Sequence, residues 1–228
     1  MPNTDPDRHR PIRSFVRRGG RLTQPQQRAL DTFWEQFGVD INQRPLLLDE
    51  LFGRTAPRIL EIGFGDGETL LTMAQSQPDN DFLGIEVHRP GVGHFLLRAA
   101  ALGLTNVRVI CADVQEVLNY LPNACLERIQ VFFPDPWPKK RHHKRRLIQP
   151  EFVAVMTRTL ERGGTLHLAT DWEEYAHWML HVLDVCETLH NTAEGGFAPR
   201  PSERPLTKFE RRGQRLGHAV WDLIFQRR

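Results

Sequence analysis

Residues 59–67 read Ile-Leu-Glu-Ile-Gly-Phe-Gly-Asp-Gly and decide the fold class of this 228-residue chain. An apolar run typical of a buried parallel strand leads into a Gly-x-Gly-x-Gly turn, and a helix-forming segment follows. Glycines in such a turn adopt backbone angles that other residues resist, and they let the backbone approach a ligand closely. The turn alone is weak evidence for a ligand site, because a tight strand-to-helix connection has the same composition.

The pattern of strand, turn and helix repeats on either side of this stretch. We expect strands at 58–62, 81–87, 107–111, 128–133 and 165–169. We expect helices at 25–37, 67–77, 90–102, 114–121, 150–160 and 172–186. This alternation predicts an α/β fold with a doubly wound, mostly parallel sheet. Toward the carboxyl terminus, strands near Leu189 and at 218–225 have no helix between them, which predicts an antiparallel pair.

Basic residues are concentrated in three segments of the chain. Residues 1–28 hold seven Arg, 139–146 hold six Lys or Arg, and 200–228 hold eight, which is 21 of the 30 basic residues. A basic surface on an acidic body indicates a polyanion partner. The two terminal segments are equally consistent with solvated tails, whereas 139–146 lies in the middle of the chain. We expect residues 1–25 to form a flexible basic arm and 26–228 a single domain.

Composition narrows the location of the protein. No apolar run approaches the roughly 20 residues needed to span a bilayer, and we expect no secretory signal. The three cysteines, Cys111, Cys125 and Cys186, are far apart and form no Cys-x-x-Cys motif. This spacing argues against disulfides or structural zinc and is typical of a reducing cytoplasm.

Acidic residues follow the next two strands. Glu86 comes 21 residues after Gly65, where a carboxylate can accept hydrogen bonds from ribose hydroxyls. Asp113 follows the third strand, where it could accept from an adenine amine or simply cap the following helix. Glu61 and Asp66 place negative charge around the glycine turn, which disfavours the pyrophosphate of NAD and favours a ligand that carries an ammonium and a sulfonium. We therefore expect S-adenosylmethionine.

The fourth strand runs into Pro134-Asp135-Pro136-Trp137-Pro138-Lys139. Prolines on both sides fix the backbone around Asp135, so its carboxylate is expected to be held in place. Trp137 offers a flat face on which a base could stack. The alternative is a proline-rich turn whose tryptophan belongs to the core.

Several segments together resemble one family of enzymes. They are Glu61–Gly67, Phe82–His88, Phe132–Trp137, Ala169–Trp172 and Thr207–Glu210. The chain resembles the bacterial tRNA (guanine-N7-)-methyltransferases over nearly its whole length. The resemblance implies a class I, Rossmann-like methyltransferase fold with seven strands, the last antiparallel. It also implies methyl transfer to a guanosine in the tRNA variable loop, which gives 7-methylguanosine.

The resemblance, together with the glycine turn, assigns roles to individual residues. The cofactor contacts are Glu61, Gly63, Gly65, Glu86, Asp113 and Asp135. The substrate contacts are Lys139, Asp171, Thr207, Lys208, Phe209 and Glu210. The RNA contacts are Arg141, His142, His143, Lys144, Arg145 and Arg146. Asp135 is the expected catalytic residue, and we expect no metal, since the histidine pair is surrounded by cations.

Guanine N7 carries a lone pair and no proton, so methyl transfer to it needs positioning more than a general base. We expect Asp135 to stabilise the positive charge that develops on the base. Three other functions stay open: methylation of a protein or small molecule, NAD-linked oxidation, and RNA binding on a catalytically inactive scaffold. The sequence indicates tRNA as the partner and no obligate protein partner, and it leaves monomer and homodimer open.

Overall fold

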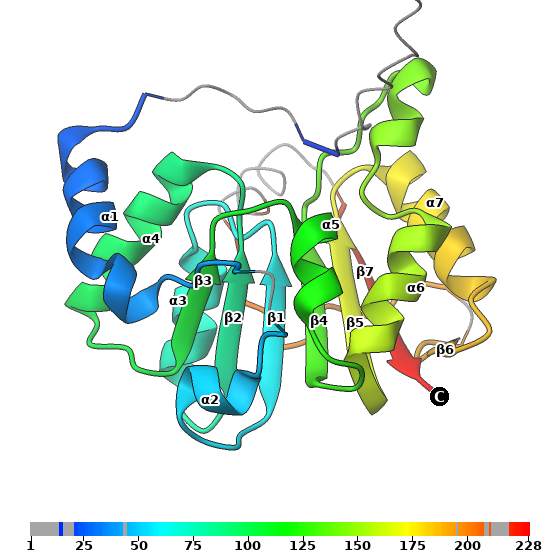
Figure 1. Ribbon diagram of the computed structural model, residues 1–228. Coiled ribbons are helices and arrows are strands. Elements are labelled where there is room, and N and C mark those ends of the chain that lie inside the picture. The colour runs from blue at the N-terminus through cyan, green and yellow to red at the C-terminus, as the bar shows by residue number, and fades with distance from the viewer. Residues whose placement is uncertain (1–13, 16–20, 43–44, 195, 208–209, 211–218) are drawn as a thin grey trace, which may run out of the picture.

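The computed structural model describes residues 14–15, 21–42, 45–194, 196–207, 210 and 219–228. This part of the chain contains a seven-stranded sheet in the order β3-β2-β1-β4-β5-β7-β6 (Figure 1). The strands are β1 Arg58–Ile62, β2 Asp81–Ile85, β3 Val107–Ile110, β4 Leu126–Phe132, β5 Leu160–Thr170, β6 Leu189–Asn191 and β7 Trp221–Arg227. The helices are α1 Gln24–Phe37, α2 Leu48–Phe52, α3 Glu68–Ser76, α4 Arg89–Ala101, α5 Val114–Val117, α6 Pro150–Thr159 and α7 Glu173–Asp184, with 3-10 turns η1 Leu118–Tyr120 and η2 Lys140–Arg145.

The strand directions confirm the predicted topology. Strands β3, β2, β1, β4 and β5 are parallel to one another, whereas β7 runs antiparallel to both β5 and β6. The order reverses between β1 and β4, so the connections after these two strands leave the sheet toward opposite sides. Ligands bind at such a reversal, beyond the carboxyl ends of the strands. No helix in the described ranges has the length and apolar character needed to cross a bilayer.

Alternate residues of the central strands enter two separate cores, as the period of a strand requires. One core holds Leu60, Leu83 and Ile110 with side chains of α5, α6 and α7. The other holds Ile59, Phe82 and side chains of α1, α3 and α4. Helices therefore cover both faces of the sheet, and burial on both faces explains the Ile, Leu and Phe residues of β1 and β2, where Glu61 and Asp81 are buried as well.

Some elements differ from the sequence-based prediction. Strand β5 begins at Leu160, five residues earlier than expected, so Gly163 and Gly164 lie inside a strand. The register of β4 against β5 shifts between Leu126 and Arg128 beside these glycines, and a side chain at Gly164 would press on backbone carbonyls. The helices α2 and η2 were not predicted, because they are only five and six residues long and give little periodic signal.

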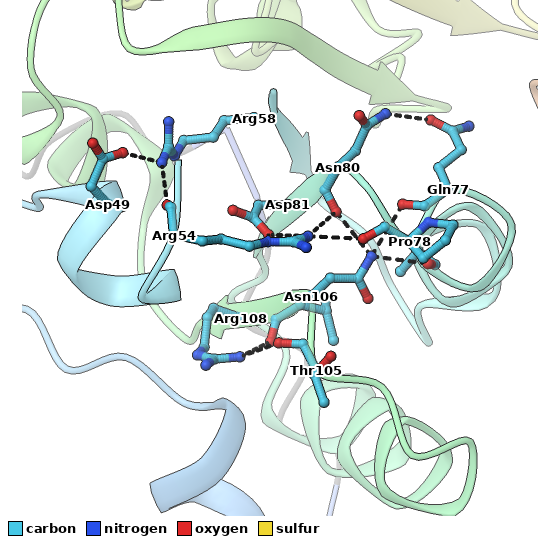
Figure 2. Close-up of polar contacts among 12 residues, drawn as sticks. Asp49, Arg54, Arg58, Gln77, Pro78, Asn80, Asp81, Thr105, Asn106 and Arg108 are labelled. Carbon is cyan, nitrogen blue, oxygen red and sulfur yellow. Dashed lines mark hydrogen bonds and ion pairs between the residues drawn. The ribbon is translucent and has the colours of Figure 1, made fainter. Parts of the chain in front are cut away.

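A polar network joins the amino ends of β2 and β3 (Figure 2). It lies away from the carboxyl ends of the strands, where ligands bind in such a fold. The buried Asp81 accepts a 2.8 Å hydrogen bond from Nε of Arg54. The side-chain amide of Asn106 donates to the carbonyl oxygens of Ala74, Gln77 and Asn80. The bonds from Asn106 satisfy backbone carbonyl groups of α3 and of the connection that leads into β2.

Candidate active site

The glycine turn after β1 has the backbone conformation that its sequence predicts. Gly63, Gly65 and Gly67 all have positive φ, at 75°, 62° and 77°. Side-chain-bearing residues rarely adopt these angles. A side chain at Gly91 of α4 would clash with the carbonyl oxygen of Gly65, so the helix after β2 packs directly on the turn.

Glu86 lies at the end of β2 and holds three backbone amides. Its Oε2 accepts from Gly65 at 2.8 Å, and its Oε1 accepts from Val87 at 2.7 Å and from His88 at 2.8 Å. A carboxylate has about four lone-pair sites, so roughly one remains for a ligand. Glu86 therefore fixes the shape of the turn, and its ligand contact stays a prediction.

Asp113 has the helix-capping role that was the alternative to ligand binding. Its Oδ1 accepts a 3.1 Å hydrogen bond from the amide of Gln115 at the start of α5. The residue also lines a cavity together with Glu86. Capping with one oxygen does not prevent ligand binding with the other, and the predicted ligand contact stays a prediction.

Glu61 is a buried carboxyl group at the start of the glycine turn. The residue is only 3% exposed, and Nε2 of Gln130 donates a 3.0 Å hydrogen bond to its Oε2. The pKa of Glu61 is raised to about 7. Burial is the largest cause, the hydrogen bond from Gln130 opposes it, and the charge of the nearby Glu86 adds to it. The ionised form would be stabilised by a cation in the adjoining cavity.

Two cavities meet where β1 and β4 end, and Gly63, Phe132 and Phe133 line both. The smaller cavity has a volume of about 230 Å³, and four predicted cofactor residues line it: Gly63, Glu86, Asp113 and Asp135. The larger has a volume of about 760 Å³, and its lining includes Glu61, Gly65, Asp66 and Thr207. The structure thus brings together residues that lie more than 140 positions apart in the sequence.

The loop around Asp135 is held at several points. The amide of Phe133 donates to the carbonyl oxygen of Ala169 at 2.8 Å, and Nε of Arg146 donates to that of Pro136 at 2.9 Å. Phe133 and Trp137, on either side of the prolines, have φ values of 54° and 46°. Such angles cost about 1–3 kcal/mol in residues other than glycine and occur mainly at functional sites.

The Trp137 side chain is partly buried and makes three contacts of its own. Its Nε1 donates a 3.0 Å hydrogen bond to the carbonyl oxygen of Ser14, which lines the smaller cavity. The guanidinium carbon of Arg145 lies 5.0 Å from its ring centre, and the His142 ring lies edge-on at 5.7 Å. Arg145 covers one face of the ring, so only the other face is available to the base stacking that the sequence suggested.

Comparison with known proteins identifies the family. A family model described as "Putative methyltransferase" matches residues 55–223. The chain is 58% identical to the tRNA (guanine-N(7)-)-methyltransferase of Halorhodospira halophila, over 96% of each chain. It is 56% identical to that of Aeromonas hydrophila, over 99% of this chain and 96% of the relative. The chain belongs to the tRNA (guanine-N7-)-methyltransferase family.

Solved structures support the fold of the methyltransferase independently of sequence. A 16S rRNA (adenine(1408)-N(1))-methyltransferase from Catenulisporales acidiphilia, crystallised with cosubstrate SAM, superposes with a TM-score of 0.57. The match covers 83% of this chain and 92% of that one at 14% identity. At this identity the likeness establishes the fold alone.

The basic segment of the methyltransferase forms the turn η2, and its members differ in exposure. Lys139, Arg141 and Lys144 are exposed, whereas Arg146 is only 3% exposed. Arg146 donates to Glu174 at 3.1 Å and lies 5.0 Å from the ring centre of Tyr175. Arg146 was expected to contact RNA, but its guanidinium is used inside the protein to hold η2 and the Asp135 loop against α7.

The two histidines of this segment are partly exposed. The pKa of His142 lies below its ordinary value, because partial desolvation and the nearby cations Arg141, Arg145 and Lys139 disfavour its charged form. His142 therefore adds little positive charge at neutral pH. His143 contacts Arg146 at 3.1 Å and lies 3.5 Å from Glu174.

The predicted substrate residues of the methyltransferase fall in different places. Asp171 follows β5 at the same sheet edge as Asp135 and is partly exposed, and Thr207 lines the larger cavity. Lys208 and Phe209 lie outside the described residues. Glu210 is buried, and both its oxygens accept hydrogen bonds from Arg204, at 2.7 and 2.9 Å. A direct substrate contact by Glu210 is therefore not what this structure supports.

Three buried residues near the site were not singled out from the sequence: Arg204, Asp222 and His167. They come from the segment before β7, from β7 itself and from β5. No spacing rule relates them, because their proximity depends on the pairing of β5 with β7. The signal in the sequence that pointed to this region was the concentration of basic residues in 200–228.

Proposed function

We propose that this protein transfers a methyl group from S-adenosylmethionine to N7 of a guanosine in tRNA, and so produces 7-methylguanosine. One observation carries the proposal beyond family membership. Asp135, fixed between two prolines, opens onto the same cavity as Glu86 and Asp113. A cofactor held by the two strand-end acids would therefore lie beside the carboxylate that we assign to the reaction.

The residues present fit S-adenosylmethionine. Gly63 has positive φ and open space where a side chain would project, so the backbone leaves room for a ligand. The buried Glu61, whose pKa is raised to about 7, would be stabilised in its ionised form by the ammonium group of the cofactor. We assign the cofactor to Glu61, Gly63, Gly65, Glu86 and Asp113. The acids would oppose a pyrophosphate, which argues against NAD.

S-adenosylmethionine supplies an electrophilic methyl group on a positively charged sulfur, and the N7 lone pair bonds to that carbon as the carbon–sulfur bond breaks. No proton leaves N7, so the site requires no general base. The base becomes cationic as the bond forms, and the Asp135 carboxylate stabilises this charge from a fixed position. Asp171 follows the neighbouring strand β5 and would help to stabilise the same positive charge.

We propose that tRNA binds across the carboxyl edge of the sheet, with its target guanosine in the variable loop. Lys139 and Thr207 would contact the nucleoside, and exposed cations of η2 would contact phosphates. This RNA surface comprises Arg141, His142, His143, Lys144 and Arg145. The N-terminal basic arm would extend it, since Ser14 lies beside Trp137.

We place the reaction in the cytoplasm. The three cysteines, Cys111, Cys125 and Cys186, are widely spaced along the chain and form no Cys-x-x-Cys motif, which is typical of a reducing compartment. The chain carries its cofactor and catalytic residues on one sheet edge, so the proposed reaction needs no protein partner; monomer and homodimer are both compatible with it.

Nucleoside analysis tests the proposal directly. Purified protein, S-adenosylmethionine and a tRNA transcript should yield 7-methylguanosine. A transcript made with 7-deazaguanosine, in which a C–H group replaces N7, should bind equally well and stay unmethylated. Methylation of the 7-deaza transcript, or a product modified at another guanine atom, would contradict the proposed target.

A further inference from the structure

A buried charged cluster lies behind the wall between the two cavities. Arg204 is 1% exposed, and its guanidinium donates to Glu210 at 2.7 and 2.9 Å and to Oδ2 of Asp222 at 3.0 Å. Oδ1 of Asp222 lies 2.7 Å from Nε2 of His167. The side chains of these four residues link β5, β7 and the segment before β7.

Burial of this many charges is unusual. Burial by itself would lower the pKa of Arg204, but its bonds to Glu210 and Asp222 outweigh that effect and raise it. Even a well-paired buried ion network is often no more stabilising than apolar packing of the same volume. The geometry that Arg204 imposes on its neighbours is therefore a better explanation of the cluster than stability.

Those neighbours belong to the site. The guanidinium carbon of Arg204 lies 5.7 Å from the ring centre of Phe132 and 6.0 Å from that of Phe133. The His167 ring meets Phe132 edge-on at 5.0 Å. Both phenylalanines line both cavities, and Phe133 has the strained φ of 54° two residues before Asp135.

The same cluster contacts Thr207, another residue that lines the larger cavity. Thr207 lies between Arg204 and Glu210 in the chain and lines that cavity. Its Oγ1 accepts a 3.0 Å hydrogen bond from the amide of Glu210. Glu210 is thus bonded both to Arg204 and to Thr207, which links the cluster to a residue that lines the cavity.

We propose that Arg204, held by Glu210, Asp222 and His167, is a positioning residue for methyl transfer. It keeps the end of β4 in its strained conformation and thereby sets the position of the Asp135 carboxylate, while Glu210, which it holds, donates its backbone amide to Thr207. The proposal rests on the proposed function of Asp135. Misplacement of a reacting group by about 1 Å can cost on the order of 100-fold in rate.

The test compares Arg204→Lys with Asp81→Asn. Asp81 is also buried and ion-paired, at 1% exposure and 2.7 Å from Arg54 (Figure 2), but it lies at the amino end of β2, away from the carboxyl edge of the sheet. Each variant is assayed well below its melting temperature, in single turnover with saturating S-adenosylmethionine and tRNA. We expect Arg204→Lys to react about 10- to 100-fold more slowly with tRNA affinity within threefold of wild type, and Asp81→Asn to keep the wild-type rate.

Hydrogen exchange gives a second readout that does not depend on activity. The Phe133 amide is bonded to Ala169 and should exchange faster in Arg204→Lys, but not in Asp81→Asn. If Arg204→Lys does not fold, Asp222→Asn serves in its place with the same expectations. A wild-type rate and unchanged Phe133 exchange in a folded Arg204 or Asp222 variant would overturn the proposal. If the wild type makes no 7-methylguanosine, the proposed function fails, and the exchange data still decide whether Arg204 positions Phe133.

Discussion

The backbone amide of Gly65 donates a 2.8 Å hydrogen bond to Oε2 of Glu86, which joins the turn after β1 to the acid after β2. The other oxygen of Glu86 accepts from Val87 and His88 where α4 begins. One carboxylate thus holds two adjacent ligand-facing turns in a single arrangement. Glu86 thus organises the backbone of these two turns through contacts within the protein.

Replacement of Glu86 by Gln should weaken cofactor binding and also loosen the glycine turn. The amide nitrogen of Gln can accept none of the three hydrogen bonds, so at least one backbone amide would lose its partner. We expect a loss of about 1–3 kcal/mol in the free energy of unfolding and a similar loss in S-adenosylmethionine affinity. Denaturant titration and calorimetry measure the two effects, and wild-type values in both would contradict this reading of Glu86.

Gly63→Ala should reduce cofactor affinity beyond its effect on stability. Gly103 is a matched control, since it has a similar φ of 62° and equally open space but lies past the end of α4. Each substitution should cost about 1–2 kcal/mol of folding free energy through its left-handed backbone. Only Gly63→Ala should lower S-adenosylmethionine affinity, by about tenfold or more; equal affinities in the two variants would exclude Gly63 from the binding site.

Glu61 should make the protein less stable as pH rises. Its pKa in the folded state, about 7, lies above the 4.5 of an exposed Glu, so the folded protein binds more protons between these values. The free energy of unfolding should therefore fall by roughly 2–4 kcal/mol between pH 4.5 and pH 8. Glu61→Gln should remove this fall, whereas Glu116→Gln, at an exposed position of α5, should not. If the wild-type dependence on pH survives in Glu61→Gln, another group is responsible for it.

Asp135→Asn should lose activity without losing stability. The side chain is exposed, and the amide keeps its shape but not the charge that stabilises a cationic base. We expect the single-turnover rate to fall by about 100-fold or more and the melting temperature to stay near that of wild type. Asp79→Asn, at an exposed position far from the site, is the control. A variant that keeps most of its rate would show that the Asp135 charge is not used.

RNA affinity should depend steeply on salt through the exposed cations of η2. Each phosphate contact contributes about −0.7 to −0.9 to the slope of log affinity against log salt. Lys144→Ala should therefore weaken tRNA binding and flatten the slope by nearly one. Arg162→Ala, exposed near the amino end of β5, should change neither quantity. Identical slopes for the two variants would place the RNA elsewhere.

The sequence by itself determined the order of strands and helices and the positions of Glu61, Glu86, Asp113 and Asp135. These features follow from local rules: apolar periodicity sets the elements, glycines set the turn, and a parallel sheet brings the strand ends to one edge. The prolines around Asp135 likewise fixed the interpretation of that loop.

Only the tertiary structure decided which charged residues are available to a ligand. Arg146 belongs to a motif that suggested RNA contacts, yet its buried guanidinium donates to Glu174. Glu210 belongs to a motif that suggested substrate contacts, yet it is paired with the buried Arg204. The cluster of Arg204, Asp222 and His167 has no counterpart in the sequence pattern, since it depends on β7 pairing with β5. Whether such a group is free to bind a ligand depends on burial and on partners far away in the chain, and local spacing encodes neither.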